Sequence, residues 1–112
     1  MAKRGVETEI ARGTGNVFAD LGYSDAGERQ TKVRLAMAIN TIVARRALTQ
    51  AAAAKVLGIN QPKVSALANY RLDGFSVERL LTFLTALDRD VDIVIRKLPK
   101  SRRTGQISVK AA

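Results

Sequence analysis

The sequence contains neither cysteine nor histidine, and tryptophan is also absent. Without cysteine, the chain can form no disulfide and offers no thiolate as a nucleophile or metal ligand. Without histidine, it lacks the commonest general base and the commonest metal ligand of proteins. The carboxylates are scattered over expected helix caps and an expected strand, and no glycine-rich phosphate loop accompanies them. We therefore expect a protein that is not an enzyme and that uses no metal and no cofactor.

Long apolar runs are also missing. No stretch approaches the roughly 18 consecutive apolar residues of a membrane span, and the N-terminus lacks the apolar core of a signal peptide. We expect no membrane partner and a cytoplasmic protein. Aromatic residues make up 4% of the chain and hydrophobic residues 46%, so the core must be mainly aliphatic. The length of 112 residues predicts a single domain.

Acidic residues are absent from two long segments of the chain. Residues 31–72 carry seven Lys or Arg and no acid, and residues 96–112 carry six and no acid. All ten acids lie in residues 1–30 and 73–95, where they are mixed with bases, and the formal net charge is +9. A solvated helical face normally mixes both signs, so an acid-free basic block is typical of polyanion binding.

The stretch around which the chain is organised is 49–70, TQAAAAKVLGINQPKVSALANY. Thr49 is a favourable N-cap for a first helix, and Gly58 suits the left-handed backbone at its end. Asn60 can cap a second helix, with Pro62 in its first turn, where a missing amide costs little. Two short helices joined by a glycine turn are the pattern of a helix-turn-helix.

Side-chain size and polarity support this pattern. The small residues Ala53 and Ala54 allow close helix approach, and four apolar residues are expected to form the seam between the helices: Leu57, Ile59, Val64 and Leu67. The second helix would then expose polar or small residues to a groove: Gln61, Pro62, Ser65, Ala66 and Asn69.

The flanking segments predict further elements. Residues 16–22 can form a single helical turn, a long helix is expected over about 26–47, and another runs from the cap Ser76 to near Asp88. Arg45 and Arg46 close the long helix, where they either complement its dipole or contact phosphate. We divide the chain into an N-terminal, partly disordered arm (1–24), the helix-turn-helix domain with its strand (25–98) and a basic flexible tail (99–112).

The β-branched segment Val91 to Arg96 predicts a strand. A lone strand leaves backbone groups unpaired, so it needs a partner. The same strand of a second copy would give an antiparallel ribbon across a two-fold axis, with Val91, Ile93, Val94 and Ile95 at the dimer interface. A short strand from the N-terminal region is the alternative. The tail is open to three interpretations: nucleic-acid affinity, a partner-binding or protease-sensitive segment, or solubility.

The stretch 49–70 resembles the DNA-binding unit of the Xre (lambda repressor/Cro-like) family. Gln50 and Gln61 open the two helices at that family's eleven-residue separation, and apolar, small or glycine residues occupy its packing positions: Ala54, Gly58, Ile59, Val64 and Leu67. The resemblance spans about Glu28 to Leu98, and it is nearest to the HigA-type antitoxin branch, which adds a C-terminal strand. It implies a mainly α fold, a lambda-repressor-like bundle of four to five helices with one C-terminal β-strand that pairs across a dimer.

The resemblance also implies a function, a homodimeric repressor that reads a palindromic operator through the helix 60–70. Gln61 can pair with adenine, Lys63 and Ser65 can bond other base edges, and Pro62 and Ala66 can touch a thymine methyl. Phosphate contacts fall to Gln50, Asn69 and Arg71, with Gln50 and Gln61 bonded to each other. As alternatives, Gln61, Lys63 and Arg71 are ordinary solvated residues and Asn69 only ends its helix.

The expected partners are double-stranded DNA, a second copy of the chain and a RelE-like ribonuclease toxin. A stand-alone Xre-type regulator would lack the toxin, and a protein-interaction module would lack the DNA. RNA binding is a further alternative, which the low aromatic content disfavours because bases then have little to stack on.

Overall fold

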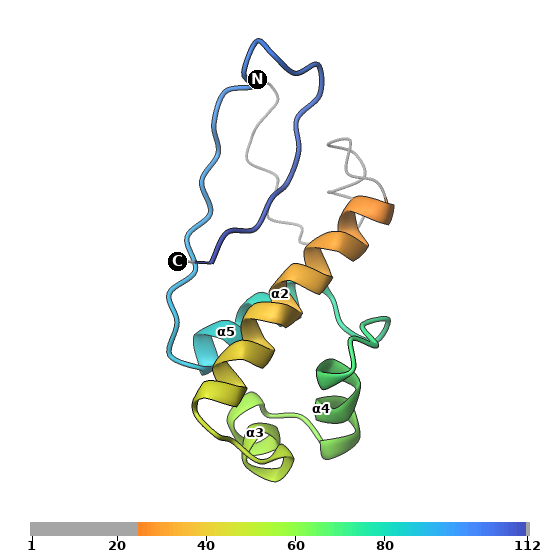
Figure 1. Ribbon diagram of the computed structural model, residues 1–112, viewed down its shortest axis with the longest axis vertical. Coiled ribbons are helices and arrows are strands. Elements are labelled where there is room, and N and C mark those ends of the chain that lie inside the picture. Colours follow the sequence, from red (N-terminus) through yellow and green to blue (C-terminus); the bar gives the residue numbers. More distant parts are fainter. Residues whose placement is uncertain (1–24, 112) are drawn as a thin grey trace.

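The computed structural model describes residues 25–111, so the predicted N-terminal arm and the predicted turn at 16–22 lie outside the described residues. The described part holds four helices: α2 (Asp25–Arg45), α3 (Gln50–Leu57), α4 (Gln61–Ala68) and α5 (Val77–Ala86). The long helix α2 crosses the molecule and packs against α5, while α3 and α4 lie together at one end (Figure 1). None of these helices has the length and apolar character needed to cross a membrane.

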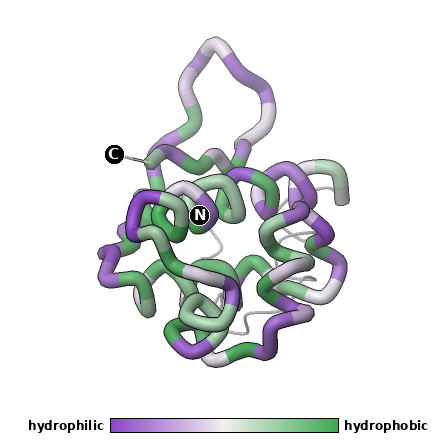
Figure 2. The backbone as a smooth tube through the Cα atoms, turned by 60° about the horizontal axis from the view of Figure 1, so that its bottom comes forward, coloured by the Kyte–Doolittle hydropathy of each residue, from purple (hydrophilic) through white to green (hydrophobic). Residues whose placement is uncertain are grey.

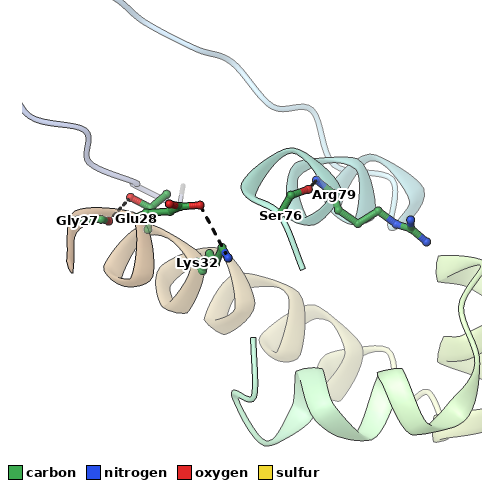
Figure 3. Close-up of polar contacts among 6 residues, drawn as sticks. Gly27, Glu28, Lys32, Ser76 and Arg79 are labelled. Atoms are coloured by element: carbon green, nitrogen blue, oxygen red, sulfur yellow. Dashed lines mark hydrogen bonds and ion pairs between the residues drawn. The ribbon is translucent and has the colours of Figure 1, made fainter. Parts of the chain in front are cut away.

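Side-chain caps fix where three of the helices begin. The Thr49 hydroxyl accepts a hydrogen bond from the Ala52 amide at 3.1 Å, and the Asn60 side-chain oxygen accepts one from the Lys63 amide at 2.9 Å. The Ser76 hydroxyl accepts from the Arg79 amide at 3.0 Å (Figure 3). Each cap satisfies a first-turn amide that has no partner within its helix. The three caps predicted from the sequence are confirmed.

The main core lies between α2 and α5. Leu35 and Ile39 of α2 are buried against Leu80 and Phe83 of α5, and the loop residue Phe75 closes the cluster. The Phe75 and Phe83 rings meet edge to face, with centroids 5.9 Å apart. This core is mainly aliphatic, as the composition predicts.

A smaller cluster joins α3 to α4. It is built from the buried side chains of Ala53, Ala54 and Val64, against which Ile59 packs. Two members of the predicted seam, Leu57 and Leu67, belong to the main core instead. The difference arises because α3 and α4 also rest on α2 and α5, so their inner faces are shared between two clusters.

Positive backbone φ angles occur just beyond the helices. Gly58 adopts φ 72° after α3, and Ala47 adopts φ 54° two residues after the end of α2. A side chain in this left-handed region clashes with the following carbonyl, whereas glycine adopts it freely. Ala47 therefore carries a conformational cost that Gly58 avoids.

This contrast gives a paired stability prediction. Gly58→Ala should lower the free energy of unfolding by about 1 kcal/mol and Ala47→Gly should raise it by a similar amount. A Cβ at position 58 would meet no atom within 4 Å, so backbone conformation alone accounts for the loss. Urea unfolding followed by circular dichroism measures both changes. Shifts of the same sign in the two variants would contradict the explanation.

After α5 the chain leaves the helical body and returns to it. Residues 91–111 form a long excursion (blue in Figure 1), whose two ends contact the main core through Val91 and Val109. None of residues 25–111 lies in a strand, and residues 91–98 make no backbone hydrogen bond within the described part of the chain. The strand predicted at Val91–Arg96 is thus not observed in the single chain, and its pairing across a dimer stays a prediction.

Candidate nucleic-acid interface

The helix α4 has one buried face and one exposed face. Val64 and Leu67 point into the two hydrophobic clusters, whereas Gln61, Pro62 and Lys63 of the first turn are exposed. The partly exposed Ser65 lies one turn further along, and the partly buried Ala66 beside it also packs against the main core. Since residues three and four apart share a helix face, Gln61 and Ser65 are neighbours on the outer surface. The structure thus brings together, on one helix, the side chains predicted for base readout.

Three further predicted residues surround α4. Gln50 is exposed in the first turn of α3, and Asn69 and Arg71 are exposed beyond the end of α4. The hydrogen bond that the family resemblance implies between Gln50 and Gln61 is absent, and neither amide has a hydrogen-bond partner among the described residues. Both amides are therefore available to a partner outside the chain.

Two of the predicted contact residues also have structural roles. The Asn69 side-chain amide donates to the Ser65 carbonyl at 2.8 Å, which closes the last turn of α4. The Lys63 ammonium lies 5.8 Å from the centre of the Phe75 ring, within the range of a cation–π interaction. The helix-ending interpretation of Asn69 is confirmed, and its contact with DNA stays a prediction. Phe75 restrains Lys63 at the edge of the exposed face.

Asn40 of α2 was not foreseen as a support for α4. Its side-chain amide donates to the Leu67 carbonyl at 3.1 Å, across 27 residues of sequence. Leu67 lies in the last turn of α4, so this bond ties the far end of that helix to α2. The one signal in the sequence for this role is that Asn40 is a polar residue on the mainly apolar inner face of its helix.

We expect Asn40→Ala to lower the free energy of unfolding by about 1 kcal/mol, because the Leu67 carbonyl loses its side-chain donor. The neighbouring exposed residue supplies a control, since the Thr41 side chain makes no hydrogen bond within the described part of the chain. Thr41→Ala should stay close to wild type in chemical denaturation. Equal losses in the two variants would show that the Asn40 bond contributes nothing specific.

Ion pairs neutralise few of the bases in residues 31–72. Lys32 pairs with Glu28 at 3.8 Å (Figure 3), and Arg46 lies 3.7 Å from an Asp88 carboxylate oxygen. Arg46 also donates to the Leu87 carbonyl at 3.4 Å, so it links the ends of α2 and α5. The five remaining bases have no acidic partner within residues 25–111: Arg34, Arg45, Lys55, Lys63 and Arg71. Three of these bases place positive charge around the helix pair: Lys55 lies on α3, Lys63 on α4 and Arg71 on the loop that follows α4.

Comparisons with known proteins agree with this geometry. A family model described as a helix-turn-helix domain matches residues 17–96. A solved structure named as an XRE family transcriptional regulator is 67% identical in sequence and superposes with a TM-score of 0.77. That similarity covers 80% of this chain and 100% of the other. None of the curated proteins matches the chain.

Proposed function

Because the chain belongs to the Xre family of helix-turn-helix transcriptional regulators, we propose that it represses transcription by reading a palindromic DNA operator through α4. The observation that carries this proposal is the exposed first turn of α4. There Gln61, Pro62 and Lys63 face outward from a part of the chain, residues 31–72, that contains no acid. A helix presented in this way can enter the major groove, which is wide enough to admit it.

The proposed base contacts follow from side-chain chemistry. The Gln61 amide offers a donor and an acceptor, which match the N6 and N7 atoms of adenine. Ser65, on the same surface one turn later, can donate to or accept from several bases, and Lys63 favours the acceptors of guanine. Pro62 and Ala66 are the apolar groups that would contact a thymine methyl.

The proposed phosphate contacts lie on either side of these readers. Gln50 and Arg71 are exposed at the start of α3 and beyond α4, where donors would meet the backbone rather than the bases. Asn69 uses one amide hydrogen on the Ser65 carbonyl and keeps the other for a phosphate. Such contacts orient the protein on the duplex without selecting a sequence.

The proposed dimer places two copies of α4 on one operator. Ile93 and Ile95 are 77% and 84% exposed in the single chain, and the backbone of 91–98 makes no hydrogen bond within residues 25–111. Pairing of this segment with its copy, through Val91, Ile93, Val94 and Ile95, would satisfy the backbone groups and place the apolar side chains of the two copies side by side. A two-fold axis then requires half-sites separated by about one DNA turn, roughly 34 Å.

An antitoxin role is a second candidate. In an extended segment Val94 points opposite to Ile93 and Ile95, so apolar side chains lie on both faces of 91–96. Pairing with a second copy uses the backbone edge of the segment and leaves both faces of the ribbon open. A RelE-like toxin can cover the apolar side chains on one of these faces, whereas a stand-alone regulator would have no such partner. Co-expression with a RelE-like toxin from a neighbouring reading frame, followed by size-exclusion chromatography, tests this. A stable complex and restored growth support the role, and separate elution with persistent toxicity contradicts it.

Operator binding itself is tested by a gel shift over a salt series. The DNA upstream of the protein's own gene is compared with an unrelated duplex of equal length. We expect tight binding to the upstream DNA that persists at moderate salt, and weak, steeply salt-dependent binding to the unrelated duplex. Equal affinity for both duplexes at every salt concentration would contradict sequence reading.

A further inference from the structure

We propose that the turn of the C-terminal excursion is a second, sequence-independent binding surface for double-stranded DNA, distinct from α4. We call this surface the basic tip, and it consists of five exposed cations: Arg96, Lys97, Lys100, Arg102 and Arg103. With α4 on an operator, the basic tip would hold a second duplex. That bridging step rests on the proposed function, whereas DNA binding by the basic tip alone does not.

The charge of the basic tip is uncompensated within residues 25–111. Residues 93–111 contain no acid, and none of the five cations has an ion pair within the described part of the chain. A cluster of exposed cations without counter-charges attracts polyanions and releases their condensed counterions when it binds.

The local backbone holds these cations together. The Arg102 amide donates to the Pro99 carbonyl at 3.1 Å, which closes a turn between the two arms of the excursion. The Arg102 guanidinium reaches the Thr104 carbonyl at 3.5 Å. At the base, Val91 and Val109 contact the main core, so the excursion is attached to the body at both ends. The five cations thus lie within residues 96–103, around a closed turn on an excursion that is attached at both ends rather than on a free chain end.

The basic tip lies far from the proposed reading helix. Figure 1 places α3 and α4 at one end of the long axis of the molecule, which measures 45 Å, and the turn of the excursion at the other. Figure 2 shows the same excursion as a loop that stands away from the helices. A duplex that contacts α4 is therefore on the opposite side of the helical body from the basic tip of that copy.

The chemistry of the basic tip favours double-stranded DNA over single-stranded nucleic acid. No aromatic residue follows Phe83, so the excursion offers no platform on which unpaired bases could stack. The basic tip also contains no Asn or Gln that could read base edges. Arg and Lys alone suit the regular phosphate rows of a duplex, which they can contact at any sequence.

A two-duplex capture assay tests the proposal. Immobilised upstream DNA is loaded with the full-length protein, and capture of a fluorescent unrelated duplex is measured. Arg102→Gln/Arg103→Gln should reduce capture about tenfold, with affinity for a single short upstream duplex changed by less than about twofold. Arg29→Gln/Arg89→Gln removes the same charge from exposed positions outside the basic tip and should capture like wild type.

Two results would overturn the proposal. In one, the tip variant loses affinity for the single upstream duplex in parallel with capture, which means that one duplex contacts both surfaces. In the other, it captures the second duplex as well as wild type does, which leaves another partner, such as an acidic protein, for the basic tip. Gel shifts on the unrelated duplex separate the two proposals. If the protein does not prefer upstream DNA, but its binding to the unrelated duplex still needs Arg102 and Arg103, only the reading role of α4 fails.

Discussion

The Gln61→Ala/Ser65→Ala variant is expected to bind the operator at least about 30-fold more weakly than wild type. A well-placed base contact contributes roughly 1–3 kcal/mol of discrimination, and a two-fold dimer loses it at both half-sites. Both side chains lie on the outer surface of α4, so their removal leaves no cavity and should not unfold the domain. Fluorescence anisotropy with upstream and unrelated duplexes measures the effect.

The matched control changes the same two residue types outside α4. Gln106 and Ser108 are exposed in the second arm of the excursion, and Gln106→Ala/Ser108→Ala should bind the operator like wild type. Affinity of the α4 variant for the unrelated duplex should change by less than about twofold, because phosphate contacts remain. A parallel loss on both duplexes would mean that Gln61 and Ser65 hold phosphates rather than read bases.

Ile93→Asp/Ile95→Asp should separate the dimer and weaken operator binding by about 100-fold or more. The paired strand would place carboxylates of two chains beside each other where apolar side chains were to be buried. Linked binding of two half-sites exceeds single-site affinity by roughly 10²–10⁴, and a monomer forfeits this gain. Sedimentation equilibrium gives the mass, and anisotropy gives the affinity for the whole operator and for one half-site.

Met37→Glu provides the control for the added charge, because Met37 is an exposed apolar residue of α2 outside the segment 91–96. It should remain dimeric and bind the operator normally. The strand variant should bind an isolated half-site as weakly as wild type does. A dimer that survives Ile93→Asp/Ile95→Asp, or a monomeric wild type, would show that this segment does not mediate dimerisation.

The parts of the fold that local chemistry determines could be predicted from the sequence. The caps Thr49, Asn60 and Ser76 and the left-handed Gly58 all lie where residue type predicts them. Each depends on hydrogen bonds or backbone angles within a few residues of the chain. The same holds for the exposed face of α4, since the buried Val64 and Leu67 set its helical phase.

Contacts between distant segments could not be predicted in this way. The bond from Asn40 to the Leu67 carbonyl and the contacts of Arg46 with the end of α5 depend on how whole helices pack. Val109 packs on the main core only because the excursion turns back at residues 99–102. Neither periodicity nor composition carries this information, because the partners of Asn40 and Arg46 lie 27 and 41 positions away and Val109 contacts a core built from earlier helices.

Chemical footprinting tests the central claim, that two copies of α4 occupy successive major grooves of a palindrome. Hydroxyl-radical protection and purine-methylation interference are measured on the DNA upstream of the gene. We predict two protected half-sites, centred about one turn or roughly 34 Å apart on one face of the duplex, with interference at guanine N7 in the major groove of each. A single half-site, diffuse protection, or interference confined to the minor groove would contradict the claim.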